Sequence, residues 1–171
     1  MLTTIINIQP MSRNAAAFFL PTELMQPVLL IQISSTGAFV PFRYVEKYKD
    51  VLRCTFGDST LQETWLGELR GGKLFSKSDA SIIKEFVSNH ITSAKAIIIH
   101  CNAGISRSPA VALALAEWLD LPKVIKQIAF NFNYFPNPHV LSICRKEFGT
   151  VVGLHAKYAE VFGKPCDPYL V

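Results

Sequence analysis

The chain has 171 residues, of which half are hydrophobic and 18% are charged. This balance is typical of a single globular domain and excludes a disordered chain. The formal charge of +4 comes from scattered lysines and arginines, so no basic block predicts a nucleic-acid or membrane partner. No apolar run approaches the ~18–20 residues of a membrane helix. We expect a soluble, cytoplasmic protein with one domain over residues 1–171, of which residues 149–171 form a loosely packed tail.

Short β-branched runs and Gly/Pro breaks predict strands that come early in the chain, followed by more helices. We expect strands at residues 2–8, which Pro10 ends, and at 28–33, 51–56 and 96–99. We expect helices at residues 14–19, 61–69, from Ser76 or Ser78 to about residue 90, 110–119, 122–129 and 140–148. Ser12 is an expected N-cap and Gly149 an expected C-terminal stop. This order implies a mixed or parallel sheet flanked by helices.

The run HCNAGISRSP at residues 100–109 lies between an expected buried strand and a strongly helical segment. Cys101 and Arg107 bracket the loop, and Pro109 suits the first turn of the following helix. Gly104 allows the backbone to turn so that successive N–H groups point inward. Backbone N–H groups and the helix dipole favour an anion at such a place.

The residue types in this loop point to phosphoryl transfer. Helix N-termini and nearby cations lower the pKa of a thiol from about 8.5 to roughly 3.5–7.5, which turns it into a nucleophile. Cys101 would have both influences, with Arg107 as the permanent cation. The planar guanidinium also grips two phosphate oxygens at once. The implied reaction is in-line attack of the thiolate on phosphorus, which forms a cysteinyl-phosphate that water then hydrolyses.

The loop resembles the His-Cys-x5-Arg-Ser/Thr signature of the cysteine-dependent protein tyrosine phosphatase superfamily. Its form here is most similar to the dual-specificity branch, including small bacterial and viral members. The resemblance implies that Cys101 is the nucleophile, Arg107 the phosphate clamp and Ser108 the group that stabilises the departing thiolate. It implies that His100 holds the loop and helps to keep the thiol ionised. The implied phosphate-binding residues are Asn102, Ala103, Gly104, Ile105, Ser106 and Arg107.

The resemblance extends to looser matches between residues 2 and 149. Small bacterial phosphatase-like proteins often carry Ser-Arg after the first strand, a strand ending in Phe-x-Asp, and Pro-Asn-Pro before the last helix. The corresponding segments here are residues 12–13, 56–58 and 136–138. The superfamily has an α/β fold with a central four- to five-stranded, mostly parallel sheet and helices on both faces, and we expect that fold.

A phosphatase of this type needs a carboxylic acid, on a separate loop, that protonates the leaving oxygen. Asp58 fits best because it follows the end of an expected strand. Asp79 is the alternative, but its place three residues after Ser76 also fits a helix cap. The sequence has no Trp-Pro-Asp triplet, and Asp58 precedes Cys101 by 43 positions, a longer interval than in compact dual-specificity enzymes.

The expected substrate is a phosphorylated protein or small phosphate ester, with phosphotyrosine and then phosphoserine or phosphothreonine as candidates. The resemblance implies that a polyphosphorylated lipid is disfavoured, because superfamily members that cleave phosphoinositides often carry Lys or Arg where this chain has Asn102, Ala103 and Ile105. A nucleotide, RNA 5′-phosphate or inositol phosphate stays open. Two other classes also stay open. One is a pseudophosphatase that only binds phosphorylated ligands. The other is an arsenate-type oxyanion reductase, which needs Cys54 or Cys144 near Cys101. No Cys or His spacing predicts a metal site, and no cofactor is expected.

Overall fold

The computed structural model describes residues 4–59 and 72–150. Its sheet has four strands in the order β1-β4-β2-β3, and every neighbouring pair is parallel. The strands are β1 (Asn7–Ser12), β2 (Val28–Ser34), β3 (Tyr48–Thr55) and β4 (Ala96–Cys101). The helices are α1 (Arg13–Phe18), α3 (Lys77–His90), α4 (Arg107–Trp118), α5 (Pro122–Ala129) and α6 (Pro138–Phe148), with short 3-10 turns at Glu23–Met25 and Val45–Lys47. The expected α/β fold with a parallel sheet is confirmed.

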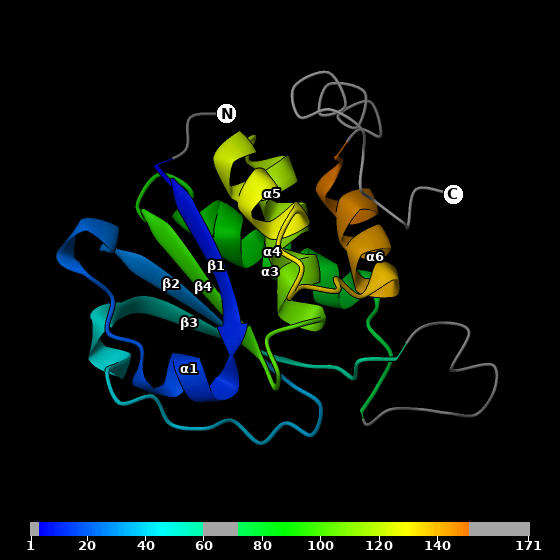
Figure 1. The fold of residues 1–171 in the computed structure, drawn as a ribbon, viewed down its shortest axis with the longest axis horizontal. Coiled ribbons are helices and arrows are strands. Elements are labelled where there is room, and N and C mark those ends of the chain that lie inside the picture. Colours follow the sequence, from blue (N-terminus) through cyan, green and yellow to red (C-terminus); the bar gives the residue numbers. More distant parts are fainter. Residues whose placement is uncertain (1–3, 60–71, 151–171) are drawn as a thin grey trace.

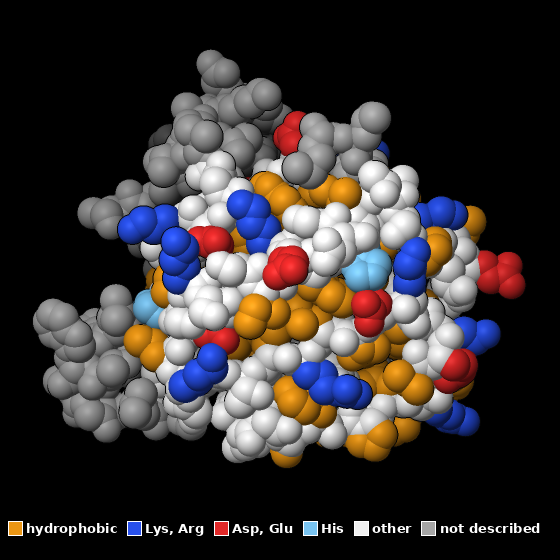
Figure 2. Space-filling model, turned by 180° about the vertical axis from the view of Figure 1, so that it is seen from behind, with side chains coloured by type: hydrophobic (Ala, Val, Ile, Leu, Met, Phe, Trp, Pro, Cys, Tyr) orange, Lys and Arg blue, Asp and Glu red, His pale blue; other side chains and the backbone are white. Residues whose placement is uncertain are grey.

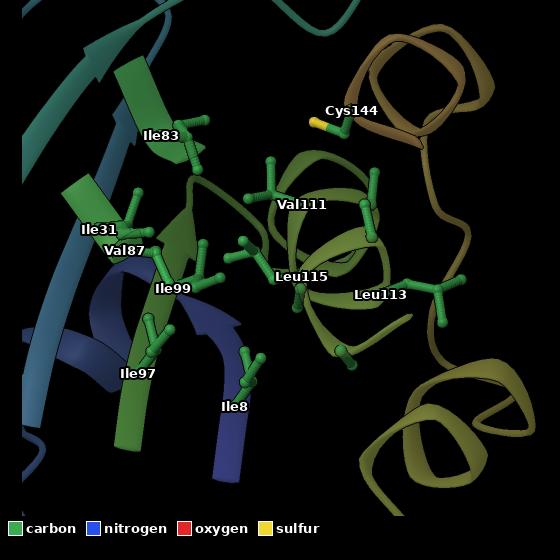
Figure 3. Close-up of a cluster of buried hydrophobic side chains, with 14 of the residues drawn as sticks. Ile8, Ile31, Ile83, Val87, Ile97, Ile99, Val111, Leu113, Leu115 and Cys144 are labelled. Carbon is green, nitrogen blue, oxygen red and sulfur yellow. The ribbon is translucent and has the colours of Figure 1, made fainter. Parts of the chain in front are cut away.

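The sheet is covered on both faces, and its two middle strands are therefore buried along their whole length. Helices α3 to α6 lie on one face and α1 lies on the other (Figure 1). On the helix-rich face, Ile97 and Ile99 point toward Val111 and Leu115 of α4 (Figure 3). Double coverage explains why β2 and β4 are continuous apolar runs instead of alternating ones.

Local sequence signals place most helix ends correctly. Ser12 caps α1 by accepting from the Ala15 N–H, and Ser76 forms a reciprocal capping box with Asp79 at the start of α3. Gly149 ends α6 with a left-handed φ of 76°. Each cap satisfies backbone groups that the helix itself leaves unpaired.

Several boundaries differ from the expectation, and the first strand differs most. β1 spans Asn7–Ser12, so Pro10 lies inside the strand and does not end it. A proline is tolerated there because β1 is an edge strand that pairs with β4 alone. Helices α4 and α6 begin at Arg107 and Pro138, two or three residues earlier than expected, and β3 begins at Tyr48. The expected helix at 61–69 and the tail lie outside the described residues, apart from Gly149 and residue 150.

The exterior carries charges of both signs without a single-sign block on the face that Figure 2 shows. In residues 4–59 and 72–150, no helix has the length and apolar character that crossing a bilayer requires. The parallel strands bring their carboxyl ends to one edge, where Ser12 of β1 pairs with Cys101 of β4. In open α/β sheets this edge is where ligands bind.

Candidate active site

Cys101 is the last residue of β4, and Arg107 begins α4, so the loop between them connects a strand end to a helix N-terminus. The sulfur is buried, and the Gly104 N–H donates to it at 3.3 Å. The Ser108 hydroxyl lies 3.2 Å from the sulfur and 3.5 Å from the Met11 carbonyl oxygen. Ser108 can therefore donate to a thiolate, or donate to Met11 while it accepts from a neutral thiol.

Gly104 lets the loop pass against the end of β1. Its φ is +76°, and a Cβ at this position would lie 2.4 Å from the Ser12 nitrogen and 2.5 Å from the Met11 carbonyl carbon. Real side chains do not tolerate such distances to backbone atoms, so only glycine fits without moving the loop. The turn expected at this residue is present, and its own N–H is the one that donates to the sulfur.

Arg107 is buried at the base of the loop with 3% of its surface exposed. Its Nη1 donates to the Ser35 hydroxyl at 2.8 Å and to the Phe56 carbonyl oxygen at 2.9 Å. Its Nε is buried and has no hydrogen-bond partner among the described residues. A buried guanidinium N–H without a partner is costly, so an anion that accepts from it would be bound favourably.

Asp58 lies directly beside this loop, although 43 positions separate it from Cys101 in the sequence. Its Oδ1 accepts from the Ser106 hydroxyl at 2.7 Å and from Asn137 Nδ2 at 2.9 Å. Asn137 Nδ2 also contacts the Asp58 carbonyl oxygen at 3.2 Å. The second carboxylate oxygen, Oδ2, has no hydrogen bond to the residues that the structure describes. One oxygen thus anchors the carboxyl group and the other is available.

Asp79, the alternative acid, makes different contacts. Its Oδ1 accepts from Lys73 Nζ at 2.6 Å, and its Oδ2 accepts from the Ser76 N–H and hydroxyl. None of these partners belongs to the loop of Cys101. The contacts are those of a helix cap reinforced by an ion pair, which is the structural role that the spacing from Ser76 also predicts.

His100 points to the face of the sheet opposite Cys101, because successive side chains of a strand alternate. Its ring packs against Phe42 with 5.2 Å between centroids, and neither nitrogen has a well-formed hydrogen bond among the described residues. The pKa of His100 is lowered to about 4, chiefly by burial; the positive charges of Arg13 and Arg107 act in the same direction, and the Cys101 backbone opposes them. The ring is therefore neutral near pH 7 and supplies no positive charge to the thiol.

The remaining loop residues form the rim of the site. Asn102, Ala103 and Ile105 are exposed, and Ser106 is half-buried. The Asn102 carbonyl oxygen accepts from the Arg13 N–H at 3.2 Å, which ties the loop to the start of α1.

Sequence reasoning missed the two groups that orient Arg107, and it identified Asn137 only as part of the Pro-Asn-Pro match at residues 136–138. Ser35 follows a buried strand, and Phe56 lies at the end of another, so their place at the carboxyl edge was the available signal. Asn137 both caps α6, by accepting from the His139 and Val140 N–H groups, and holds Asp58. The prolines on either side of Asn137 predict a turn, but they do not predict the contact between Asn137 and Asp58.

The other described cysteines are free thiols in the core. Burial raises the pKa of Cys54 to about 12, and burial raises the pKa of Cys144 even further. Both are therefore neutral thiols near pH 7. Within the described ranges, no group of three or more His, Cys, Asp or Glu side chains could hold a metal ion.

No family model and no curated protein sequence matches this chain. Among solved structures, the fold is similar to the crystal structure of Tk-PTP in the active form, with 12% identity and a TM-score of 0.48, covering 84% of this chain and 90% of that one. It is also similar to the crystal structure of human DUSP28, with 16% identity and a TM-score of 0.48, covering 92% of this chain and 99% of that one.

A buried sulfur, an anchored carboxyl group and a buried guanidinium, whose Nε has no partner in the part of the chain that the structure describes, come from the ends of parallel strands and the loops that follow them. The chain thus has the strand–loop–helix architecture, on a four-stranded parallel sheet, that its resemblance to cysteine-dependent phosphatases predicted.

Proposed function

We propose that this protein is a phosphatase that hydrolyses phosphate monoesters, phosphotyrosine foremost, through a cysteinyl-phosphate intermediate. The observation that carries the proposal is the pairing of Cys101 and Arg107 across one loop. The sulfur accepts the Gly104 N–H, and the guanidinium Nε is buried without a partner among the described residues. A phosphate dianion over the sulfur would accept from Nε and from loop amides.

In the first step, the Cys101 thiolate attacks phosphorus, and the bond between phosphorus and the ester oxygen breaks. The leaving oxygen takes a proton from the Asp58 carboxyl group and departs as a phenol or alcohol. The contacts of Asp58 support this role, because Ser106 and Asn137 hold Oδ1 beside the loop and leave Oδ2 to carry the proton. The nucleophile and the acid are thus positioned by separate elements.

In the second step, water attacks phosphorus and the sulfur–phosphorus bond breaks. The Asp58 carboxylate accepts the proton of that water, and inorganic phosphate is released. The departing sulfur is again a thiolate, which the Ser108 hydroxyl stabilises by donating at 3.2 Å. A charge-assisted bond of this kind is stronger than one between neutral groups.

Phosphotyrosine suits the burial of the two groups. Cys101 and Arg107 are 2% and 3% exposed, so a phosphate on a long side chain would reach them more readily than one close to a peptide backbone. An aryl ring is long enough to do so while the peptide backbone stays outside, and the rim residue Ile105 is apolar and exposed. A phosphorylated protein is therefore the partner that we propose.

The alternative classes gain no support from the site. An oxyanion reductase needs relay thiols that ionise, whereas burial keeps Cys54 and Cys144 neutral. A pseudophosphatase would have lost a reacting group, but Cys101, Arg107 and Asp58 all lie at the same edge of the sheet.

The test is hydrolysis of aryl phosphates that differ in leaving group. We expect Cys101→Ser to abolish turnover, with Cys54→Ser as the control for loss of a buried thiol. We expect Asp58→Asn to slow phenyl phosphate by about 10²–10⁴-fold, the range of a general acid, and to slow an activated nitrophenyl ester much less. Residual turnover above a few per cent in Cys101→Ser would contradict the nucleophile, and an equal loss for both esters would remove Asp58 from the role of acid.

A further inference from the structure

A groove of about 670 Å³ lies over α5 and the turn that follows it. Its walls include Lys123, Lys126, Phe130, Phe132 and Asn133. We refer to this feature as the aromatic groove. None of the residues described above as reacting groups lines it, so the proposed chemistry leaves it without a role.

The turn that lines the aromatic groove leads directly into a segment bonded to the rim of the site. The Phe135 N–H donates to the Ile105 carbonyl oxygen at 2.8 Å, and the Asn137 N–H donates to the Ser106 carbonyl oxygen at 3.1 Å. These bonds attach the segment between α5 and α6 to the phosphate-binding loop, next to the start of α4 (Figure 1). Asn133 lines the aromatic groove and lies two residues before Phe135, which bonds to the rim. The chain between these two residues therefore spans about 7 Å at most. A few residues of an extended peptide span that distance.

Large apolar side chains are exposed along this path. The exposed fraction is 95% for Phe132, 62% for Phe135 and 43% for Ile105. Single exposed apolar residues are ordinary, but several that surround a candidate site favour an interaction surface. An apolar side chain of a bound partner would remove part of this area from water.

The charge of the aromatic groove has one sign. Lys123 and Lys126 contribute to its walls, and no Asp or Glu does so within the described part of the chain. The turn is also ordered before any partner binds, because Asn131 accepts from the Asn133 and Tyr134 N–H groups and the Tyr134 hydroxyl donates to the Pro10 carbonyl oxygen. Such a preordered surface loses little entropy on binding.

We propose that the aromatic groove binds the residues that flank phosphotyrosine in a peptide substrate, and that it prefers acidic and large apolar side chains. This inference rests on the proposed phosphatase function and names the substrate class of that site. Lysines complement acidic side chains, and Phe132 and Phe135 complement apolar ones. A nucleic acid is less well matched, because grooves for single strands carry rows of cations along the backbone, and this groove has two lysines.

The test compares two phosphotyrosyl peptides of equal length that carry either Glu and Leu or Gln and Ser around the phosphotyrosine. We expect kcat/KM to be about tenfold higher for the acidic, apolar peptide, which corresponds to about 1.4 kcal/mol. Phe132→Ala and Lys123→Gln should each lower the ratio of the two kcat/KM values several-fold. Both variants should leave hydrolysis of nitrophenyl phosphate unchanged. Leu24→Ala, an 85% exposed apolar residue near the amino end of β2, is the matched control and should leave the preference intact.

Equal kcat/KM for the two peptides would overturn the groove proposal while the phosphatase activity stands. The groove proposal would also be overturned if kcat/KM were higher for a 5′-phosphorylated RNA than for both peptides and if Phe132→Ala reduced kcat/KM for that RNA. If no ester is hydrolysed, the phosphatase proposal fails, and binding of fluorescent peptides to the Cys101→Ser protein still tests the groove. If the acidic peptide then binds more weakly to the Cys101→Ser, Lys123→Gln double variant than to Cys101→Ser alone, the groove proposal is supported. Unchanged binding would refute the groove proposal.

Discussion

His100 should make the fold sensitive to mild acid. In the folded chain burial lowers the pKa of this ring to about 4, whereas in the unfolded chain it titrates near its ordinary value of about 6.5. Between these two values the unfolded state binds more protons, so the free energy of unfolding falls as the pH falls. The contribution is absent above about pH 7, where both states hold a neutral ring.

The linkage relation gives the size of the effect. The difference of about 2.5 pKa units makes the full penalty about 3 kcal/mol, reached below pH 4, and the loss between pH 7 and pH 5 is about 2 kcal/mol. With an m-value of about 2 kcal/mol per M of urea, the unfolding midpoint should move by about 1 M. Replacing His100 by a residue that does not titrate separates its contribution from that of the carboxylates, because the carboxylates remain in every variant.

The assay is urea unfolding at pH 7 and pH 5, followed by circular dichroism, for the natural protein and for His100→Gln and His100→Phe. We expect the loss of stability on acidification to be about 2 kcal/mol smaller in both variants, whatever their stability at pH 7. Two replacements are used because Gln keeps a polar group and Phe keeps a ring against Phe42. An equal loss in all three proteins would refute the coupling between this ring and folding.

Three further predictions concern the loop and its support. Gly104→Ala should keep the fold, by circular dichroism, but lose about 10²-fold or more in kcat/KM, because a Cβ at a φ of +76° displaces the loop. Asn137→Ala should lower the free energy of unfolding by about 1 kcal/mol with the lost cap, and it should also slow phenyl phosphate hydrolysis, since it removes the donor that holds Oδ1 of Asp58. Arg145→Met should cost about 3–5 kcal/mol in urea unfolding, because it leaves Glu117 buried without its partner. Lys77→Met is the control for this variant, because Lys77 forms an exposed ion pair with Glu147. We expect Lys77→Met to lower the free energy of unfolding by only about 0–1 kcal/mol.

Local signals in the sequence were sufficient for the strand–loop–helix setting of Cys101 and Arg107 and for most elements around it. Cys101, Gly104 and Arg107 lie within seven consecutive residues, so a strand before them and a helix after them already determine how they are presented. Ser12, Ser76 and Gly149 end their helices as expected, because capping involves only backbone groups within a few residues. The apolar runs of β2 and β4 likewise required no knowledge of their neighbours.

Only the tertiary structure decided how distant residues support that loop. Asp58, Ser35 and Asn137 come from three separate connections, and their contacts with the loop or with each other span up to 79 positions. Such contacts depend on strand order and on the path of each connection, which hydrophobic periodicity does not encode. The same holds for Pro10, because its place inside β1 is acceptable only at the edge of the sheet. The sequence by itself thus determined which groups gather in the loop of Cys101, and the order of the parallel strands decided which distant groups contact that loop.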